Sequence, residues 1–462
     1  MVSGDLDRSL GLYQTMMISM GAMIGSGIFV LPALGYKKAG PAVILAYVLA
    51  GLVVLPAALS KAEMSTAMPE SGGTYLYIDR AMGPLFGTIA GIGAWFSLVF
   101  KSSFALVGLG AYLVVFAGAL EGSLMLIALL LGVAVVVLNI SGTKVSGQVQ
   151  AVIVTLVVVG LAAYTINAGF VMDVSRFTPE EGFATHGSAG VVTAAAFVFV
   201  SYAGVTKVAS VAEEVKDPGK NLPLAILGSL AVMTLIYVAV VAAVVGLSDP
   251  EILTHGGPDD GASLTPMADG AEALFGGLGA VIISVIAVVA LTSMANAGIL
   301  SSSRFPLAMS RDSLLPAGLQ TIDERFKTPR NSILLTGAVL LFLIRFVPVV
   351  ELAKLASAFQ ILVFSIINVA LITFREAELS SYNPEFTSPA YPYVQVVGLL
   401  GGLGLLTQMG AMPILGAVGI IAGGLVVYLV YGRTRTDRTG ALGKIMHGEA
   451  ESDNVVDPAE TD

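Results

Sequence analysis

The chain has no cysteine and little charge: 12% of its 462 residues are charged, whereas 56% are hydrophobic. Without cysteine, disulfides and thiolate metal sites are excluded. The three histidines, His186, His255 and His447, are far apart and outside the apolar stretches, so they do not indicate a shared metal site. Soluble domains carry about 25% charged residues. The low charge therefore excludes an ordinary soluble protein and predicts one that crosses a membrane repeatedly.

Other absences exclude further classes of function. The net charge is −9 and no basic cluster is present, which excludes nucleic-acid binding. No Gly-x-x-x-x-Gly-Lys-Ser/Thr motif occurs, so a nucleotide-driven pump is not expected. A membrane hydrolase needs a base beside its nucleophile, and no histidine lies in an apolar stretch. We therefore expect neither enzyme activity nor a cofactor.

Apolar stretches recur along almost the whole chain. A helix needs about 20 residues to cross the roughly 30 Å hydrocarbon layer of a bilayer. We expect an all-α integral membrane protein with twelve such helices, at about 12–34, 41–67, 84–117, 123–141, 148–168, 190–212, 222–247, 274–301, 332–348, 352–373, 392–410 and 412–432.

The distribution of charge between loops predicts the orientation. The N-terminus has no cleavable signal, so the first helix is retained. Most Lys and Arg residues fall on the side of the N-terminus, whereas the acidic loop 248–273 has none. Positive loops stay inside, so we expect a plasma-membrane protein with both termini, 1–11 and 433–462, in the cytoplasm. The acidic tail 433–462 is expected to be disordered.

Three glycines interrupt the first apolar stretch. Gly21, Gly25 and Gly27 lie in Gly-Ala-Met-Ile-Gly-Ser-Gly-Ile-Phe-Val-Leu, residues 21–31. Each costs about 1 kcal/mol of helix stability relative to alanine, so this segment is expected to unwind. Unwound backbone at membrane depth is found where it lines a protein cavity that holds a ligand, water or an ion.

The sixth stretch has a similar interruption, in which Ser201, Gly204, Thr206 and Lys207 break the apolar run. Breaks at matching positions of two five-helix units are typical of inverted-repeat transporters. We expect repeats at about 12–168 and 190–373, with two extra helices at 392–432. The alternative is that these small residues only serve close helix packing.

A broken helix suits the two charges of an amino acid zwitterion. Free amides near Ser26, Gly27 and Ile28 suit the carboxylate, and carbonyls near Ala22, Met23 and Ile24 suit the ammonium. The sixth helix is expected to supply further carbonyls, with an aromatic residue as a candidate lid over the substrate. These additional positions are Phe199 and Val200 for the carbonyls and Tyr202 for the lid.

Four motifs resemble the amino acid-polyamine-organocation transporters, over about residues 10–432. The resemblance implies a twelve-helix fold with a five-plus-five inverted repeat, discontinuous helices 1 and 6 and two extra helices, moving amino acids or related amines by alternating access. By this resemblance, Val200 aligns with a tryptophan of some relatives. The motifs are Gly21-Ala-Met-Ile-Gly-Ser-Gly-Ile-Phe29, Pro69-Glu-Ser-Gly-Gly-Thr-Tyr75, Ala212-Glu-Glu-Val-Lys-Asp-Pro218 and Ser303-Arg-Phe-Pro-Leu-Ala-Met-Ser-Arg-Asp-Ser-Leu-Leu-Pro316.

Lys101 lies midway along the third stretch, too deep for its side chain to reach either membrane surface. A charge there costs about 2.5–3.5 kcal/mol on insertion scales, so it should face the interior. One interpretation is a structural lysine that caps carbonyls of a broken helix. The other, implied by the resemblance, is that Ser97, Lys101 and Ser102 border the substrate pocket, where Lys101 repels cationic substrates or exchanges a proton.

The coupling ion is left open between proton and sodium. Some proton-coupled relatives carry a fifth-helix lysine in place of a bound cation, but Val157 occupies that approximate position here. A sodium ion has candidate oxygen ligands, although ordinary helix packing explains them equally well. The candidates are the carbonyls of Gly21 and Ile24 and the side chains of Thr292, Ser293 and Asn296.

Together these features predict a secondary active transporter in a lipid bilayer that favours neutral or acidic amino acids. Two alternatives stay open. One is an exchanger of polyamines or cationic amino acids. The other is a non-transporting amino acid sensor with the same fold.

Overall fold

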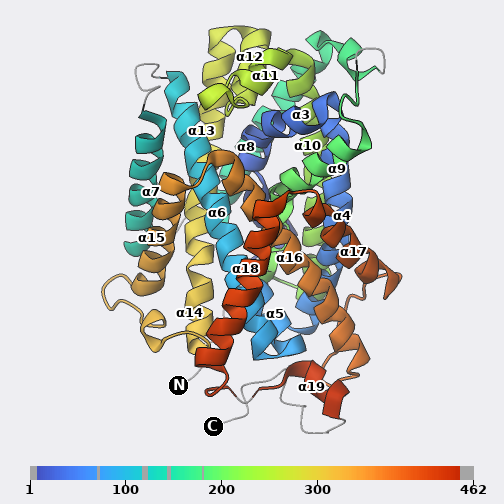
Figure 1. Cartoon of the computed structure of the whole chain (residues 1–462), viewed down its shortest axis with the longest axis vertical. Coiled ribbons are helices and arrows are strands. Elements are labelled where there is room, and N and C mark those ends of the chain that lie inside the picture. Colours follow the sequence, from blue (N-terminus) through green and yellow to red (C-terminus); the bar gives the residue numbers. More distant parts are fainter. Residues whose placement is uncertain are drawn as a thin grey trace.

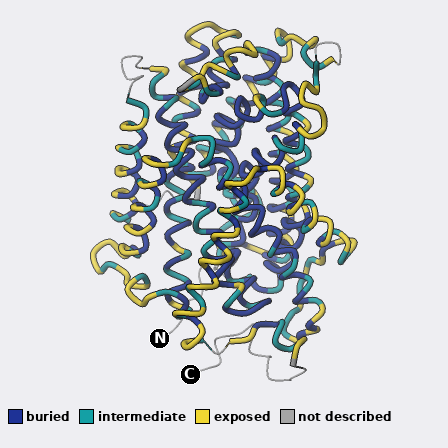
Figure 2. The backbone as a smooth tube through the Cα atoms, in the orientation of Figure 1, coloured by how far each residue is buried: buried dark blue, intermediate teal, exposed yellow. Residues whose placement is uncertain are grey.

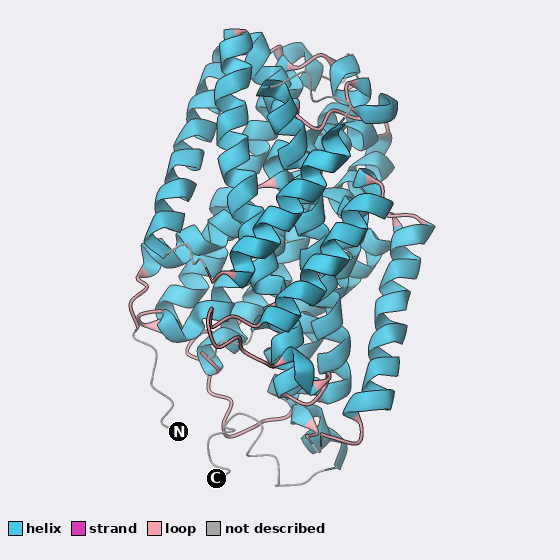
Figure 3. Cartoon of the chain, turned by 90° about the vertical axis from the view of Figure 1, so that its left-hand side faces the viewer, coloured by secondary structure: helices cyan, strands magenta, loops and turns pink. Residues whose placement is uncertain are grey.

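The computed structural model describes residues 8–69, 73–116, 123–142, 147–178, 182–436 and 438–447. Within these ranges the regular elements are helices, and one isolated bridge joins Leu10 to Val215. Figure 3 shows the helices packed side by side along one direction. Residues 70–72 of the second motif lie outside the described residues.

Eight helical segments among the described residues are long and apolar enough to cross a membrane. Two helices, α7 (Leu124–Ile140) and α17 (Tyr393–Thr407), are apolar but shorter, and two more, α1 (Leu12–Met23) and α15 (Arg330–Phe346), accompany them. The multi-pass character predicted from composition is thus present. The eight segments are Leu31–Ala67, Pro84–Phe116, Gln148–Val171, Gly187–Glu214, Pro218–Leu247, Gly277–Arg311, Val349–Glu376 and Ala411–Gly432.

The remaining regular elements of the described residues are further helices and short 3-10 turns. In chain order they are α2 (Ser26–Phe29), α3 (Leu31–Ala39), η1 (Gly40–Ala42), α4 (Val43–Ala67), α5 (Gly73–Met82), α6 (Pro84–Phe116), α8 (Gly147–Val171), η3 (Val174–Phe177), α9 (Gly187–Val198), η5 (Phe199–Gly204), η6 (Lys207–Glu214), α10 (Pro218–Leu247), α11 (Pro250–His255), η7 (Pro258–Asp260), α12 (Pro266–Phe275), α13 (Gly277–Ser302), α14 (Arg304–Arg311), η8 (Ala317–Leu319), α16 (Val349–Glu376), α18 (Ala411–Val427), the π-helical η9 (Tyr428–Gly432) and α19 (Gly440–His447).

Helices α6 and α16 form the centre of the bundle, and most of their residues are buried (Figure 2). Helices α8 and α18 lie at the periphery and expose much of their length. The outward faces remain apolar, with Leu235, Leu278 and Val430 at least 70% exposed. An exposed apolar belt of this kind is stable in lipid but not in water.

The two ends of the bundle differ. Helices α11 and α12, from the acidic 248–273 loop, lie at one end, and α5, α14 and α19 lie at the other (Figure 1). We call the latter the α5–α14 end. The start of α1 also lies beside the end of η6, because Leu10 and Glu214 share a backbone hydrogen bond.

Part of the acidic tail differs from the expectation of disorder. Residues 440–447 form helix α19, and Ala441 within it is fully buried. Gly83 and Gly440 allow this contact because each adopts a positive φ and their backbones approach closely. Residues 448–462 lie outside the described residues.

Candidate functional site

The first helix is broken at the glycine pattern. Helix α1 ends at Met23, Ile24 is extended at φ −67° and ψ 120°, and α2 begins at Ser26. The sequence therefore predicted the location of the break correctly. The sixth helix is interrupted differently, since α9 gives way at Phe199 to the 3-10 helices η5 and η6 rather than to unwound backbone.

The two interrupted helices meet at Gly204. A Cβ atom built on Gly204 would lie 2.3 Å from the carbonyl carbon of Ala22. A Cβ on Gly27 would lie 2.7 Å from the Oγ of Ser201. Only glycine permits both approaches, so these residues bring the two interruptions into contact.

Side chains from other helices bind the carbonyls at the break. The ammonium of Lys101 donates to the carbonyl of Ala22 at 3.0 Å. The hydroxyl of Tyr237, on α10, lies 2.7 Å from the Met23 carbonyl and 3.0 Å from the Ser201 carbonyl. In this conformation, two carbonyls expected to bind a substrate ammonium, those of Ala22 and Met23, are held by the protein itself.

The amides on the other side of the break have partners of unequal strength. The Ser26 amide donates to the sulfur of Met294, on α13, at 3.4 Å. The Ile28 amide bonds to the Gly25 carbonyl within the turn. Sulfur is a weak acceptor. Of these two amides, the Ser26 amide is therefore the one that more readily donates to a carboxylate instead.

A cavity of about 470 Å³ extends from the break toward the α5–α14 end. Ala22, Lys101 and Met294 line its deep part, and Arg304 and Arg311, both exposed, mark where it reaches the surface. Its volume lies in the range of small-molecule sites, about 300–1,000 Å³. The lining comes from the break of the first helix, the sixth helix, α4, α5, α6, α13, α14 and α16.

Cations outnumber carboxylates along this cavity. Lys61, Lys101, Lys207, Arg304 and Arg311 line it, against Glu213 and Asp312. Such a cleft concentrates anions and repels cations.

The three lysines each contact an oxygen of the cavity wall. Lys61 donates to the Thr74 hydroxyl at 2.6 Å, and Lys207 lies 3.5 Å from the Ala297 carbonyl. Lys207 therefore faces the cavity.

The third-helix candidates separate into two groups. Lys101 and Ser102 line the cavity, and the Ser102 hydroxyl bonds back to the Leu98 carbonyl of its own helix. Ser97 instead bonds to α16, to the Ala356 carbonyl and the Gln360 side chain. Gln360 itself lines the cavity.

The sixth-helix candidates lie behind the cavity wall. The Val200 amide donates a hydrogen bond to the Ser357 hydroxyl at 3.1 Å, and the Phe199 ring packs on Phe364. Tyr202 is fully buried and donates to the Tyr47 carbonyl of α4 at 2.8 Å. In this conformation Tyr202 joins α4 to the sixth helix and does not reach over the cavity.

Two of the sodium candidates, Ser293 and Asn296, form hydrogen bonds with other side chains. Ser293 donates to the side-chain oxygen of Gln150, on α8, and a Cβ on Gly21 would lie 2.7 Å from the Gln150 amide nitrogen. Asn296 accepts from Asn139, and Thr292 is exposed. The Ile24 carbonyl lies in the extended segment of the break. Gln150 thus occupies the space between Gly21 and Ser293.

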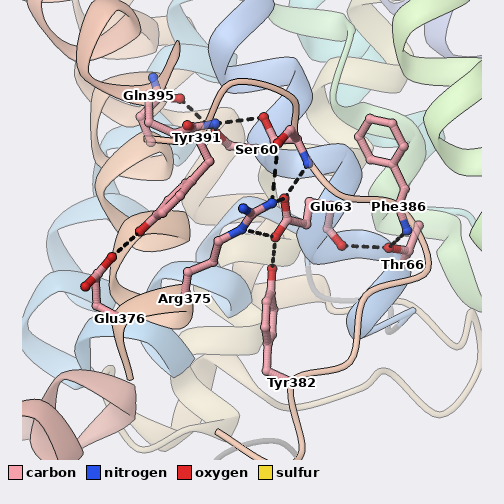
Figure 4. A network of polar contacts seen from close by, with 11 residues as sticks. Ser60, Glu63, Thr66, Arg375, Glu376, Tyr382, Phe386, Tyr391 and Gln395 are labelled. Atoms are coloured by element: carbon pink, nitrogen blue, oxygen red, sulfur yellow. Dashed lines mark hydrogen bonds and ion pairs between the residues drawn. The ribbon is translucent and has the colours of Figure 1, made fainter. Parts of the chain in front are cut away.

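Two polar networks fix the α5–α14 end. In Figure 4 the buried carboxylate of Glu63 accepts from Arg375 at 2.6 and 2.8 Å, from the Ser388 amide and from Tyr382. This network joins α4, α16 and the segment before α17. The ion-pair partner of Glu63 is Arg375, on α16.

The second network lies at the cavity mouth. Arg438 contacts Asp79 of α5 at 3.2 Å and Asp312 at 3.7 Å. Asp312 also accepts from Tyr75, which lines the cavity. Burial raises the pKa of Asp79 to about 6, although Arg438 opposes this shift.

Sequence reasoning missed several cavity residues, among them Lys61, Tyr75, Met294, Arg304 and Gln360. Glycines within an apolar stretch marked the break. No comparable local signal marks a methionine or glutamine on another helix as its neighbour. The missed residues are brought together by helix packing, which one sequence does not specify.

A multi-pass helical bundle with two interrupted helices meeting at a cation-lined cavity is the architecture of a membrane transporter. Comparison with known sequences agrees. The profile of the amino acid permease family matches residues 10–433, and the chain belongs to this family.

Individual relatives match over nearly their whole length. The chain is 32% identical to the branched-chain amino acid permease BcaP of Bacillus subtilis, covering 93% of this chain and 94% of that protein. It is 31% identical to the methylthioribose transporter of Bacillus subtilis, covering 93% and 95%. It is 27% identical to the serine/threonine exchanger SteT of the same organism, covering 87% and 91%.

Proposed function

We propose that this permease is a secondary active transporter that moves neutral or acidic amino acids across the plasma membrane by alternating access. The observation that carries the proposal is the cavity between the broken first helix and the α5–α14 end, with its excess of cations. A carboxylate is common to all amino acids and is attracted to such a cavity. The proposal of neutral substrates is supported by relatives that are named for branched-chain amino acids and for serine and threonine.

The proposed architecture is twelve membrane helices in a five-plus-five inverted repeat, 12–168 and 190–373, with two extra helices at 392–432. The two interruptions, at Ile24–Gly25 and at Phe199–Gly204, support it because they fall in the first helix of each repeat. We further propose that both termini lie in the cytoplasm. The cavity then opens inward, because it reaches the end that carries α5 and α14.

In the proposed binding mode the substrate carboxylate accepts a hydrogen bond from the Ser26 amide, and the substrate ammonium donates to carbonyl oxygens of the break. Lys101 holds the Ala22 carbonyl and adds a positive charge to the cavity. A cationic side chain in the same cavity would be repelled by Lys101 and Lys207, which disfavours polyamines and arginine.

The proposed coupling is to protons or to exchange rather than to sodium at the Gly21–Ser293 position. Gln150 fills the space between these residues and uses the Ser293 hydroxyl. Its side chain carries no charge, so this contact needs no cation to hold α1, α8 and α13 together.

A thermal-shift screen tests the proposal with the purified protein. A ligand that binds only the folded state raises the melting temperature according to its concentration and Kd. The set contains the common amino acids, methylthioribose and the polyamines. We expect stabilisation by neutral or acidic amino acids. Stabilisation by polyamines and arginine alone would contradict the proposed substrate class, and stabilisation by methylthioribose alone would contradict amino acid recognition.

A further inference from the structure

The side chain of Met294 fills the concave side of the break. Its sulfur accepts a hydrogen bond from the Ser26 amide at 3.4 Å and lies 4.0 Å from the Ser26 hydroxyl oxygen. A Cβ built on Gly25 would lie 1.8 Å from the same sulfur. Met294 is 6% exposed and lines the cavity, so it separates the Ser26 amide from the cavity.

A thioether is a poor partner for this amide. Sulfur is a weak acceptor, whereas a carboxylate forms a shorter, charge-assisted hydrogen bond that is roughly twice as strong as a neutral one. Methionine is also unbranched and changes conformation readily. A carboxylate that enters the cavity can therefore displace the thioether from the amide.

A second polar group beside the break also has an unmet hydrogen bond. The Oγ of Ser201 is fully buried and has no hydrogen-bond partner among the described residues. It lies against Gly27, where a Cβ would come within 2.7 Å of it. A buried hydroxyl without a partner is costly, so a ligand group that reached Ser201 would gain a hydrogen bond there.

Met294 also limits the space next to this position. One turn further along α13, Gly298 lines the cavity and touches Ser102 so closely that a Cβ there would lie 2.1 Å from its Oγ. Between this close contact and the break, the flexible Met294 side chain forms part of the wall. A substrate side chain that points toward α13 must share this volume with it.

We propose that Met294 is a specificity-determining residue of the carboxylate site. Its thioether holds the Ser26 amide in the empty carrier, is displaced by the substrate carboxylate and then packs against the substrate side chain, which restricts the carrier to amino acids with short side chains. This inference rests on the proposed function, since it needs an amino acid carboxylate in the cavity.

Two substitutions separate the roles of acceptor and volume. Met294→Leu keeps a similar volume but leaves the Ser26 amide without an acceptor in the empty state, so amino acid Kd should fall by roughly three- to tenfold, the range expected for one hydrogen bond. Met294→Ala opens the wall, so bulky amino acids that wild type rejects should bind. Met309→Leu is the control, because Met309 is a buried methionine packed on Gly91 outside this cavity.

The displacement itself is read by NMR of the wild-type protein with ¹³C-labelled methionine methyl groups. The Met294 resonance, identified by its loss in Met294→Leu, should shift when the best amino acid from the thermal-shift screen is added, and the Met309 resonance should not. If wild type binds that amino acid but the Met294 resonance stays in place, or if both variants keep the wild-type Kd and substrate range, Met294 is ordinary packing and this inference is wrong. If wild type binds no amino acid, the proposed function fails instead.

Discussion

The ammonium of Lys101 lies 3.0 Å from the carbonyl oxygen of Ala22, at the end of the first half-helix. Carbonyls at a helix C-terminus carry partial negative charge, and a cation there is stabilising. The same side chain lines the cavity. The two interpretations of Lys101 from sequence, a structural cap and a pocket residue, therefore describe one position that can serve both.

Two variants of Lys101 distinguish charge from capping. Lys101→Gln keeps an N–H donor for Ala22 but removes the charge, whereas Lys101→Met removes both. At about 6 Å and an effective dielectric near 20, two like charges repel by about 3 kcal/mol, or roughly two orders of magnitude in selectivity. We expect Lys101→Gln to fold and to lose most discrimination against cationic amino acids, measured by competition binding. Wild-type selectivity in Lys101→Gln would leave Lys101 as a cap alone.

Gly204→Ala should destabilise the protein strongly. The added Cβ meets backbone atoms of Ala22, which cannot rotate away as a side chain can. We expect a loss of about 1–3 kcal/mol or more, as for overpacked cores, seen as a lower melting temperature. The control is Gly404→Ala on α17, where nothing lies within 4 Å of the added Cβ. Equal melting temperatures for the two variants would show that the first and sixth helices do not meet at Gly204.

The raised pKa of Asp79 predicts that the stability of the protein depends on pH. Its folded-state pKa of about 6 lies above the ordinary value of 3.8 for an aspartate, chiefly because of burial, with Arg438 and Arg80 lowering it and Asp312 raising it further. The folded protein thus binds this proton more tightly than the unfolded chain, and protonation of Asp79 contributes to the free energy of unfolding. This contribution is complete below about pH 4 and is lost as pH rises through 6.

The measurement is the melting temperature from pH 5 to 8. We expect Asp79→Asn to remove this part of the pH dependence and to be more stable than wild type at pH 7.5. Arg438→Ala should shift the transition to higher pH, because it removes the cation that lowers the pKa of Asp79. An Asp79→Asn protein with the unchanged wild-type pH profile would contradict the assignment.

The contact between Gln150 and Ser293 predicts transport without sodium. Uptake into proteoliposomes should be the same when sodium is replaced by choline, because Gln150 already fills the space beside Gly21. Sodium-dependent uptake that disappears in Ser293→Ala would show instead that a cation displaces Gln150 during transport.

The sequence predicted those features that depend on local composition. Three glycines within an apolar stretch located the break at Ile24–Gly25, because glycine destabilises a helix wherever it occurs. The depth of Lys101 predicted that it faces the interior, since lipid does not tolerate a charge at that depth. Both arguments need only neighbouring residues.

Features that depend on helix packing could not be predicted. Tyr202 lies close to the break in sequence, yet it points toward α4, whereas Met294 and Tyr237 reach the break from helices far along the chain. Apolar stretches that are hydrophobic on every side do not indicate which face meets which neighbour. Arg375 as the partner of Glu63 was missed for the same reason.

The central claim is that the carrier recognises an amino acid by its carboxylate and transports it. The direct test is uptake into proteoliposomes of the preferred amino acid and of the amine that lacks only its carboxylate. A site built around that group should prefer the amino acid by at least about 100-fold in kcat/KM, with accumulation or exchange that empty liposomes lack. Equal uptake of the amine would contradict carboxylate recognition, and binding of the amino acid without any uptake would show a sensor rather than a transporter.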